Sequence, residues 1–334
     1  MTSPTTSAVT GTTMRAVVQD RYGTSEVWRL DLVPRPTATA GHVLVRVAAA
    51  GLDRGTEHLM NGMPYVMRLG FGLRAPRNPV PGRDVAGTVE AVGPGVTRFE
   101  VGDEVYGVAP GSFAEYALAP EDKLAPKPVS LSFAQAAAVP ISAGTALQAL
   151  QDAGRVQAGQ SVLVLGASGG VGSYAVQLAK AFGAEVTGVC STANVEFVAS
   201  LGADHVLDRE RVDFADGART YDLILDIAGN PSVRRLRRAL SPGGTVVLVG
   251  GENAGRLTGM GRQLRAAMVS LFVGERLVMF LAKERASDYE RLAELVDAGI
   301  VTPALHRAYP LDHAPEAMRL LETDQVRGKV AITL

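Results

Sequence analysis

The sequence predicts an α/β protein made of two parts, a β-rich domain and a domain built around a doubly wound parallel sheet. Three observations support this. An apolar strand, a glycine turn and an amphipathic helix follow one another without a spare residue at 162–182. Short β-type runs separated by glycines fill the chain up to about residue 127, and strands alternate with helices from residue 161 onward. With 334 residues and 47% hydrophobic content, the chain is long enough for two cores.

The overall charge and the hydrophobic runs exclude several classes of function. The formal net charge is −1, which leaves no basic field for nucleic acid and no polybasic patch for a membrane surface. The apolar run at 269–282 is interrupted by Glu275 and Arg276 and cannot span a bilayer. We therefore expect a soluble protein with neither nucleic acid nor a membrane as a partner.

Cysteine and histidine content bears on the compartment and on metal binding. Cys190 is the single cysteine, so no disulfide can form within the chain, as expected in a reducing cytoplasm. A four-cysteine zinc site is impossible, and the five histidines show no metal-ligand spacing. Residues 1–13 are rich in Ser and Thr and lack the basic start and apolar core of a secretory signal, so we expect a disordered tail and a cytoplasmic location.

The first part of the chain has the pattern of an antiparallel, barrel-like β domain. Its β-type runs lie at residues 15–19, 42–51, 87–93, 103–108 and 113–119. Glycines recur between these runs too often for helix. The segment 59–79 is expected to be a long loop on this domain, and long loops often carry function.

From residue 128 onward the periodicity changes. Helical segments are expected at 131–138 and 144–153, divided at Pro140. Strands are expected at 161–165, 185–190, 205–207, 223–227 and 245–250, followed by a strand at 276–281 and a helix at 287–298. Strands this apolar are typical of a parallel sheet buried on both faces. The closing run GKVAITL has β character and is expected to return to the first domain.

The glycine turn predicts a binding site for the pyrophosphate of a dinucleotide. Because Gly169 and Gly172 lack a Cβ, the backbone can turn tightly and a phosphate can approach the first N–H groups of the following helix. The helix dipole favours the anion. An ordinary tight turn rarely needs four glycines in seven residues. The residues expected to bind the phosphates are Gly166, Ala167, Ser168, Gly169, Gly170, Val171 and Gly172.

Several longer segments resemble the medium-chain dehydrogenase/reductase superfamily, in its zinc-independent quinone-oxidoreductase branch. They are PGRDVAGTVEAVGPGVTRFEVGDEVYG at 81–107, GSFAEYALAPEDKLAPKP, AAAVPISAGTALQAL, the glycine-turn segment, LGADHVLD and RGKVAITL. The resemblance covers nearly everything after Met14. It implies a GroES-like catalytic domain formed by 14–135 and 283–334, and a Rossmann NADP-binding domain at 136–282 inserted between them. The site would lie in the cleft between the two domains.

The resemblance also bears on catalytic zinc, because the superfamily contains zinc alcohol dehydrogenases. In those enzymes a Cys and a His stand at the positions that Asp53 and Arg83 occupy here. Zinc prefers thiolate or imidazole ligands, and an arginine would repel it. We therefore expect no metal. Negative charge that develops on a substrate oxygen must then be met by hydrogen-bond donors.

The end of the second strand of the dinucleotide fold favours NADPH over NADH. An acidic side chain about 20 residues after the glycines usually binds the ribose diol and excludes a 2′-phosphate. This chain has Ser191 and Thr192 there, and no carboxylate. Arg209 is a candidate partner for the phosphate, with an exposed loop arginine as the equally weighted alternative. The basic residue that the family carries after the Ser/Thr pair is missing, since Ala193 and Asn194 follow.

By resemblance, further residues line the cofactor. Thr145 would sit beside the nicotinamide, and its alternative role is that of a hydroxyl at a helix start. The other residues, at the ends of later strands, are Ala228, Gly229, Val249 and Gly250.

Three residues are candidates for catalysis: Tyr65, Asp53 and Arg83. Tyr65 has a phenol proton to donate, or is a packed loop aromatic. Arg83 carries a permanent charge that could face a substrate oxygen. Asp53 and Arg54 stand where the branch commonly has Asn and Pro, and an ion pair of Asp53 with Arg54 or Arg83 is the expected structural role.

These features predict hydride transfer from NADPH to a quinone or an α,β-unsaturated carbonyl, acceptors that need no Lewis acid. Two alternatives remain open. An enoyl-thioester reductase of polyketide or fatty-acid assembly would use the same chemistry, with Arg68, Arg74 and Arg77 available for a phosphopantetheine arm. A sensor or structural protein would bind NADPH without turnover.

The resemblance also implies a homodimer, formed through the strand expected at 276–281. Its run LVMFL would lie at the edge of the parallel sheet, where an apolar strand is a liability unless it is paired. Pairing with its own copy across a two-fold axis would remove that edge.

Overall fold

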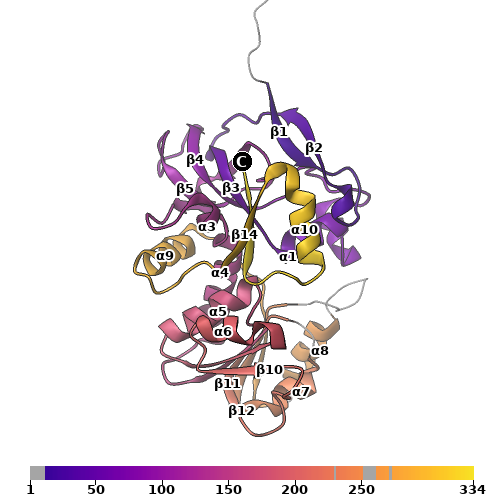
Figure 1. The fold of residues 1–334 in the computed structure, drawn as a ribbon, viewed down its shortest axis with the longest axis vertical. Helices are drawn as coiled ribbons and strands as arrows, with labels where there is room; N and C mark the ends of the chain where they lie inside the picture. Colours follow the sequence, from indigo (N-terminus) through magenta and orange to yellow (C-terminus); the bar gives the residue numbers. More distant parts are fainter. Residues whose placement is uncertain (1–11, 229–230, 251–260, 271–272) are drawn as a thin grey trace, which may run out of the picture.

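The computed structural model describes residues 12–228, 231–250, 261–270 and 273–334. Figure 1 shows two lobes stacked along the longest axis of the molecule. The upper lobe combines the indigo and purple N-terminal segments with yellow C-terminal ones, and the lower lobe holds the middle of the chain. In the described part of the chain, no helix is long and apolar enough to cross a membrane.

The upper lobe contains a small two-stranded sheet and a larger mixed sheet. The small sheet pairs β1 (Thr13–Val18) with β2 (Arg29–Pro34). The larger sheet has the order β14 (Leu305–Pro310), β15 (Lys329–Thr333), β3 (His42–Leu52), β4 (Asp84–Val92), β5 (Glu104–Val108) and β7 (Leu124–Pro126), and β6 (Tyr116–Pro120) pairs with β3. β15 lies antiparallel to β3, so the closing run GKVAITL belongs to this sheet.

One strand pair of the upper lobe departs from the expected antiparallel pattern. β14 and β15 are parallel. They are joined by α10 (Ala314–Glu322), because parallel neighbours need a crossover connection. Figure 1 shows α10 beside β14.

The segment 59–79 is not one long loop, as the sequence analysis expected. Its start belongs to α1 (Arg54–Asn61), which ends at Gly62 with a φ of 64°. A 3₁₀ turn at Tyr65–Met67 then leads into the short α2 (Arg68–Phe71). Helices this short have too few turns to show a period in sequence.

The lower lobe is a six-stranded parallel sheet within the described residues. Its order is β10 (His205–Asp208), β9 (Glu185–Cys190), β8 (Ser161–Leu165), β11 (Tyr221–Asp226), β12 (Leu240–Leu248) and β13 (Arg276–Met279). The sequence order reverses between β8 and β11, which is the switch point of a doubly wound sheet. β11 and β12 begin before the expected strands, and β13 ends two residues earlier than expected.

Other helices cover both faces of this sheet or pack against strands of the upper lobe. They are α3 (Phe133–Ala137), α4 (Pro140–Gln148), α5 (Gly170–Ala181), α6 (Val195–Ser200), α7 (Val233–Arg238), α8 (Gly261–Ser270) and α9 (Ala286–Asp297). Short 3₁₀ turns at Ser25–Val27, Glu121–Lys123, Thr192–Asn194 and Leu311–His313 and a π-helical turn at Ala149–Gly154 complete the described elements. The two expected helices are separate at Pro140, but the second begins four residues earlier than expected, because Pro140 is the first residue of α4, where its missing N–H costs nothing.

The two lobes share a hydrophobic core. One buried cluster joins Ala86 and Tyr106 of the upper lobe to Val164 and Leu178 of the lower one. Tyr106 also donates a hydrogen bond from its hydroxyl to the carbonyl oxygen of Tyr289. The two lobes are therefore packed against each other through buried side chains.

Candidate functional site

The glycine turn between β8 and α5 is shaped by two close backbone approaches. A Cβ on Gly172 would lie 2.1 Å from the carbonyl oxygen of Gly166, so only glycine fits there. Gly166 has a φ of +86°, which L side chains rarely adopt. A Cβ on Gly169 would meet only the Gly166 carbonyl oxygen, at an ordinary 3.5 Å. The protein itself leaves the space outside Gly169 open, as a phosphate cradle requires.

The carboxyl ends of the strands bring most of the predicted cofactor residues to one edge of the sheet. The N–H groups of Gly166 and Ala167 both donate to the carbonyl oxygen of Val189 at the end of β9. Ala228 follows β11 and donates to Leu165, while the N–H groups of Val249 and Gly250 donate to the carbonyl oxygen of Asp226. Ligands of doubly wound sheets bind at such an edge. Gly229 lies outside the described residues.

Thr145 lies within α4 and not at its start. Its hydroxyl donates to the carbonyl oxygen of Ile141 at 2.6 Å. The alternative role as a helix-start hydroxyl is therefore wrong, because the helix begins five residues earlier. A contact of Thr145 with the nicotinamide stays a prediction.

The end of β9 carries hydroxyls, as expected, together with two carboxylates that the sequence count missed. Thr192 donates to Asp208 at 2.7 Å and to Glu210 at 3.1 Å. The hydrogen bond from Thr192 is the main reason that the pKa of Asp208 lies below its usual value. Both acids come from the end of β10, the parallel neighbour of β9, so spacing along β9 alone could not reveal them.

Asp208 lines a groove of about 480 Å³ together with Thr192, Val195 and Arg211. Arg211 pairs with Asp208 at 3.4 Å. The side chain of Arg209 is exposed, and its N–H donates to the carbonyl oxygen of Cys190. Ser191 and Ser168 both accept hydrogen bonds from Asn194, which connects the ribose end of the predicted site to the glycine turn.

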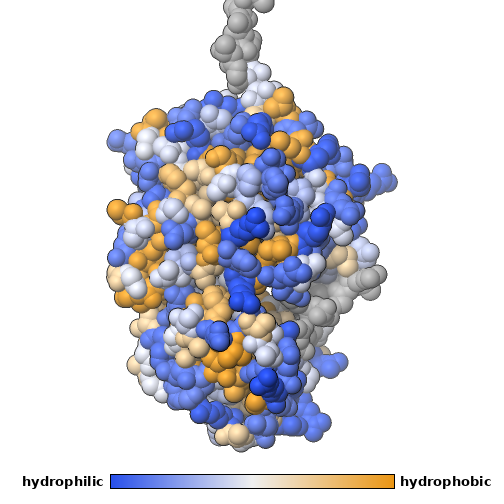
Figure 2. All heavy atoms as spheres, viewed as in Figure 1, coloured by the Kyte–Doolittle hydropathy of each residue, from blue (hydrophilic) through white to orange (hydrophobic). Residues whose placement is uncertain are grey.

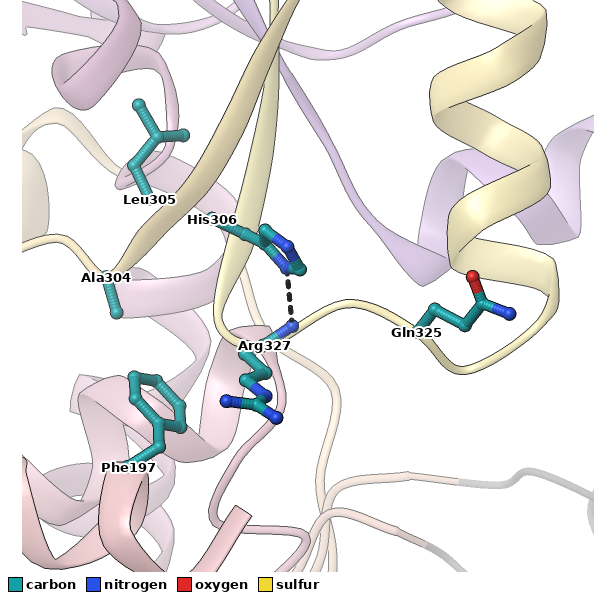
Figure 3. Close-up of a pocket in the computed structure, with 6 residues that line it drawn as sticks. All are labelled: Phe197, Ala304, Leu305, His306, Gln325 and Arg327. Carbon is teal, nitrogen blue, oxygen red and sulfur yellow. Dashed lines mark hydrogen bonds between the residues drawn. The ribbon is translucent and has the colours of Figure 1, made fainter. Parts of the chain in front are cut away.

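A second groove, of about 460 Å³, lies between α6 and the segments around β14 and β15 (Figure 3). Phe197 faces it from the lower lobe, and His306 and Arg327 face it from the upper lobe. The backbone N–H of Arg327 donates to Nδ1 of His306 at 3.0 Å. A neutral His306 therefore carries its proton on Nε2, as a donor. Figure 2 shows strongly hydrophilic residues at the centre of this face, where the two lobes meet.

Asp53 caps α1 and does not form an ion pair. Its Oδ1 accepts from the N–H of Thr56 at 2.7 Å and from the hydroxyl of Thr56 at 3.1 Å. Asp53 is 8% exposed, and its Oδ2 is buried without a hydrogen-bond partner. The expected ion pair with Arg54 or Arg83 was wrong, since Arg54 pairs with Glu57 and Asp324. A buried acceptor without a donor is costly, which is typical of a functional position.

The other two candidate catalytic residues are less enclosed. Arg83 forms an ion pair with Glu284, at the point where the chain re-enters the upper lobe. Tyr65 is 44% exposed, and the guanidinium of Arg68 stacks over its ring at 4.7 Å. No hydrogen bond or ion pair between the described atoms joins Asp53, Tyr65 and Arg83. Their catalytic roles stay predictions.

Sequence reasoning missed a buried charge pair beside these residues. Asp84 is 0% exposed and Lys329 is 1% exposed, and the Lys329 ammonium lies 3.3 Å from Oδ2 of Asp84. Oδ1 of Asp84 accepts from the N–H of Ile141 at 2.8 Å. Burial raises the pKa of Asp84 to about 6, the charge of Lys329 opposes that rise, and the nearby Asp53 adds to it. In both cases the charged residue is the first of a mostly apolar strand, which was the available sequence signal.

The same pair reaches the glycine turn. A Cβ on Gly170 would lie 3.1 Å from Cδ of Lys329, and the N–H of Gly328 donates to the carbonyl oxygen of Ser168 at 2.9 Å. The start of β15 therefore connects Asp84, at the start of β4, to the turn expected to hold the pyrophosphate.

The described residues contain no group of three His, Cys, Asp or Glu side chains placed to hold a metal ion. Cys190 is buried, and burial raises the pKa of its thiol to about 11, so the thiol is protonated at neutral pH.

Comparisons with known proteins agree with this geometry. Residues 39–129 match the alcohol dehydrogenase GroES-like domain, and residues 201–332 match the zinc-binding dehydrogenase domain. The quinone oxidoreductase of Mus musculus is 34% identical over 321 residues, covering 91% of this chain and 92% of the mouse protein. The 2-methylene-furan-3-one reductase of Solanum lycopersicum is 33% identical, covering 96% of this chain and 79% of that protein. The solved quinone oxidoreductase from Coxiella burnetii superposes with a TM-score of 0.84 at 29% identity, over 96% of this chain and 99% of that one.

Proposed function

Because the chain belongs to the quinone oxidoreductase-like branch of the medium-chain dehydrogenase/reductase superfamily and is an oxidoreductase, we propose that it reduces a quinone or an α,β-unsaturated carbonyl with NADPH and without zinc. The observation that carries the proposal is the glycine turn, which is tight at Gly172 and open outside Gly169. When bound, the reduced nicotinamide supplies a hydride.

The residues present fit the nucleotide along its length. The first N–H groups of α5, next to Gly169, would bind the pyrophosphate. Ser191, Thr192 and Arg209 would bind the ribose and its 2′-phosphate, and Thr145 would lie against the nicotinamide. Asp208 and Glu210 oppose a 2′-phosphate by charge, so Arg209 is the residue on which the NADPH preference depends.

Zinc independence rests on donor chemistry. Asp53 and Arg83 supply neither thiolate nor imidazole, and the guanidinium of Arg83 is always charged. A substrate whose reduction leaves an enolate or phenolate oxygen can instead be stabilised by N–H or O–H donors. Arg83 and Tyr65 carry donors of this kind.

We assign to Asp53 the role of the residue that donates a proton to the substrate. Its Oδ1 is fully used by Thr56, while its Oδ2 is enclosed and free of protein partners. A carboxyl proton on Oδ2 of Asp53 would be donated to a bound substrate, since no described protein group accepts a hydrogen bond there.

The first experiment measures NADPH oxidation with a panel of quinones and enones. Turnover of at least one acceptor, with NADPH preferred over NADH and no loss of rate on chelation, is the expected result. Tight NADPH binding with every acceptor untouched would favour the sensor or structural alternative. Inhibition by an acyl-CoA, competitive with the enone, would favour the enoyl-thioester reductase.

Asp53→Asn tests the proton donor without disturbing the helix. Asn caps a helix as well as Asp does, so the fold and NADPH binding should be unchanged. Loss of the acid should lower kcat by about 100-fold or more. An unchanged kcat would leave Asp53 with its capping role alone.

We also propose a cytoplasmic homodimer that pairs through β13. This strand is at the edge of the six-stranded sheet, and Met279 and Leu281 beside it are 40% and 90% exposed. A dimer by light scattering, converted to monomer by Val278→Lys, is expected. A wild-type monomer at micromolar concentration would contradict this proposal.

A further inference from the structure

The segment that begins at the 3₁₀ turn before α2 exposes five apolar side chains close together in sequence. Tyr65, Val66 and Phe71 are 44%, 40% and 48% exposed, and Leu69 and Leu73 are each 69% exposed. We call these five residues the apolar knob. Single exposed apolar residues are ordinary, but five large ones within residues 65–73 indicate a contact surface.

The knob is held rigidly in this exposed form. The N–H of Gly72 donates to the carbonyl oxygen of Arg68, and the N–H of Arg77 donates to that of Phe71 at 2.7 Å. The hydroxyl of Tyr22 donates to the carbonyl oxygen of Gly72 at 2.6 Å. A Cβ on Gly72 would lie 2.0 Å from the carbonyl oxygen of Ala75, so this tight turn needs glycine. The leucines on either side of Gly72 therefore cannot easily fold back onto the protein.

The charge around the knob has one sign. From residue 58 to residue 83 the sequence contains four arginines and no Asp or Glu. Arg74 and Arg77 form no ion pair with any carboxylate of the described residues, and Arg68 stacks over Tyr22 and Tyr65. The balanced charge of the whole chain, −1, conceals this local excess.

Rigid protruding Leu and Phe side chains next to unpaired arginines match the chemistry of one partner, an anionic lipid surface. The apolar side chains would enter the acyl boundary, and the arginines would face the lipid phosphates. An acidic protein would satisfy the arginines but would leave the leucines without a counterpart. A second copy of the chain would bring like charges together at a two-fold contact.

We propose that the apolar knob and its arginines dock the protein peripherally on anionic membranes. This proposal departs from the expectation of no membrane partner, which came from the net charge of the whole chain. The knob lies between Asp53, which caps α1, and Arg83, so both ends of this segment lead to the candidate site. Docking would bring the site to the surface in which lipid-soluble quinones and enals are dissolved. Docking itself does not depend on the proposed reaction.

The test is co-sedimentation of the full chain with vesicles, with no substrate present. Vesicles of phosphatidylcholine with about one third phosphatidylglycerol should bind the protein at low salt, and pure phosphatidylcholine should bind it far more weakly. Arg74→Ala with Arg77→Ala should weaken binding about 25-fold, at about fivefold for each arginine. Leu69→Ser with Leu73→Ser should weaken binding to a comparable degree.

Matched control variants change the net charge and the exposed apolar surface as the test variants do, but at other places on the protein. Arg15→Ala with Arg234→Ala removes two exposed arginines elsewhere, and Val101→Ser with Val129→Ser removes two valines that are 66% and 90% exposed. Neither control should change vesicle binding. Circular dichroism and NADPH titration verify that every variant is folded.

Three results would overturn the proposal. They are the absence of wild-type binding to anionic vesicles, equal binding to pure phosphatidylcholine, and equal loss in the control variants. If the leucine variant changes the oligomeric state by light scattering while the wild type ignores vesicles, the knob contacts a second copy instead.

Discussion

The two sides of the cleft are shaped by different parts of the chain, one by the backbone and the other by side chains. On the cofactor side, the backbone makes the site: Gly172 packs against Gly166, and strand ends line up at one edge of a parallel sheet. On the side of the candidate catalytic residues, side chains determine it: Asp53 has an unpartnered oxygen, and among the described residues Asp84 forms an ion pair with Lys329 alone. Backbone geometry is common to a family, whereas side-chain charge can differ between its members. This contrast explains why the nucleotide is easier to assign than the acceptor.

The largest expected effect comes from Lys329→Met. It would leave the buried Asp84 without a counter-charge, and breaking a buried pair typically costs about 3–5 kcal/mol. Lys180→Met is the matched control, because its pair with Asp204 is about one third exposed and should be worth about 1 kcal/mol or less. Denaturant unfolding measures both. Equal losses would show that the Asp84–Lys329 pair is not special.

The same pair should make stability depend on pH. The pKa of Asp84 is raised to about 6 in the folded protein, from 3.8, so between these values the folded state binds more protons than the unfolded state. The stability that this proton contributes is fully present below pH 4 and is lost as pH rises to about 6, by about 3 kcal/mol.

Asp84→Asn isolates this contribution, because asparagine does not titrate. The difference in unfolding free energy between wild type and variant, followed from pH 4 to pH 7, should change in the stated direction. Other carboxyls such as Asp204 have lowered pKa values and change stability in the opposite sense, so only the difference is informative. A difference that stays flat across this range would contradict the assignment.

Substitutions at two glycines of the turn distinguish an effect on stability from an effect on NADPH binding. Gly172→Ala should destabilise the protein by about 2 kcal/mol, since its Cβ would overlap a backbone oxygen that cannot move away. Gly169→Ala should leave stability nearly unchanged but weaken NADPH binding, because its Cβ would point into the open cradle. Thermal unfolding and NADPH fluorescence titration measure the two effects. Unchanged NADPH binding in Gly169→Ala would place the phosphates elsewhere.

The smallest expected effect concerns cofactor choice. Arg209→Ala should raise the KM for NADPH about tenfold and leave the KM for NADH unchanged, because a charge-assisted phosphate contact is lost. Arg211→Ala is the control, since Arg211 is already paired with Asp208. Equal changes for NADPH and NADH would make Arg209 an ordinary surface residue.

Local patterns predicted the cofactor side well. The strands at 161–165 and 185–190 occur at the expected residues, because strands buried on both faces are continuously apolar. The start of α4 was missed because Pro140 both ends and begins helices, and sequence alone does not separate these cases. The turns at 65–71 were missed because three or four residues carry no period.

The substrate side depends on contacts that no local window contains. Asp84 and Lys329 are 245 positions apart in sequence, and Arg83 and its partner Glu284 are also far apart in sequence. The capping role of Asp53 could have been predicted from the sequence, because an Asp before a helix, followed by Thr56 three residues later, is a local pattern. The helix itself was not predicted there, so the cap was not considered.

The contact of Gly328 with Ser168 sets a limit on when the protein can become active during its synthesis. The lower-lobe sheet from β8 to β13 can assemble once residue 279 has left the ribosome. Until β15 is added beside β3, Asp84 lacks its ion pair with Lys329, and the glycine turn lacks the hydrogen bond from Gly328 to Ser168. A ribosome that stalls before residue 333 would therefore release a chain with a nearly complete nucleotide fold that does not catalyse.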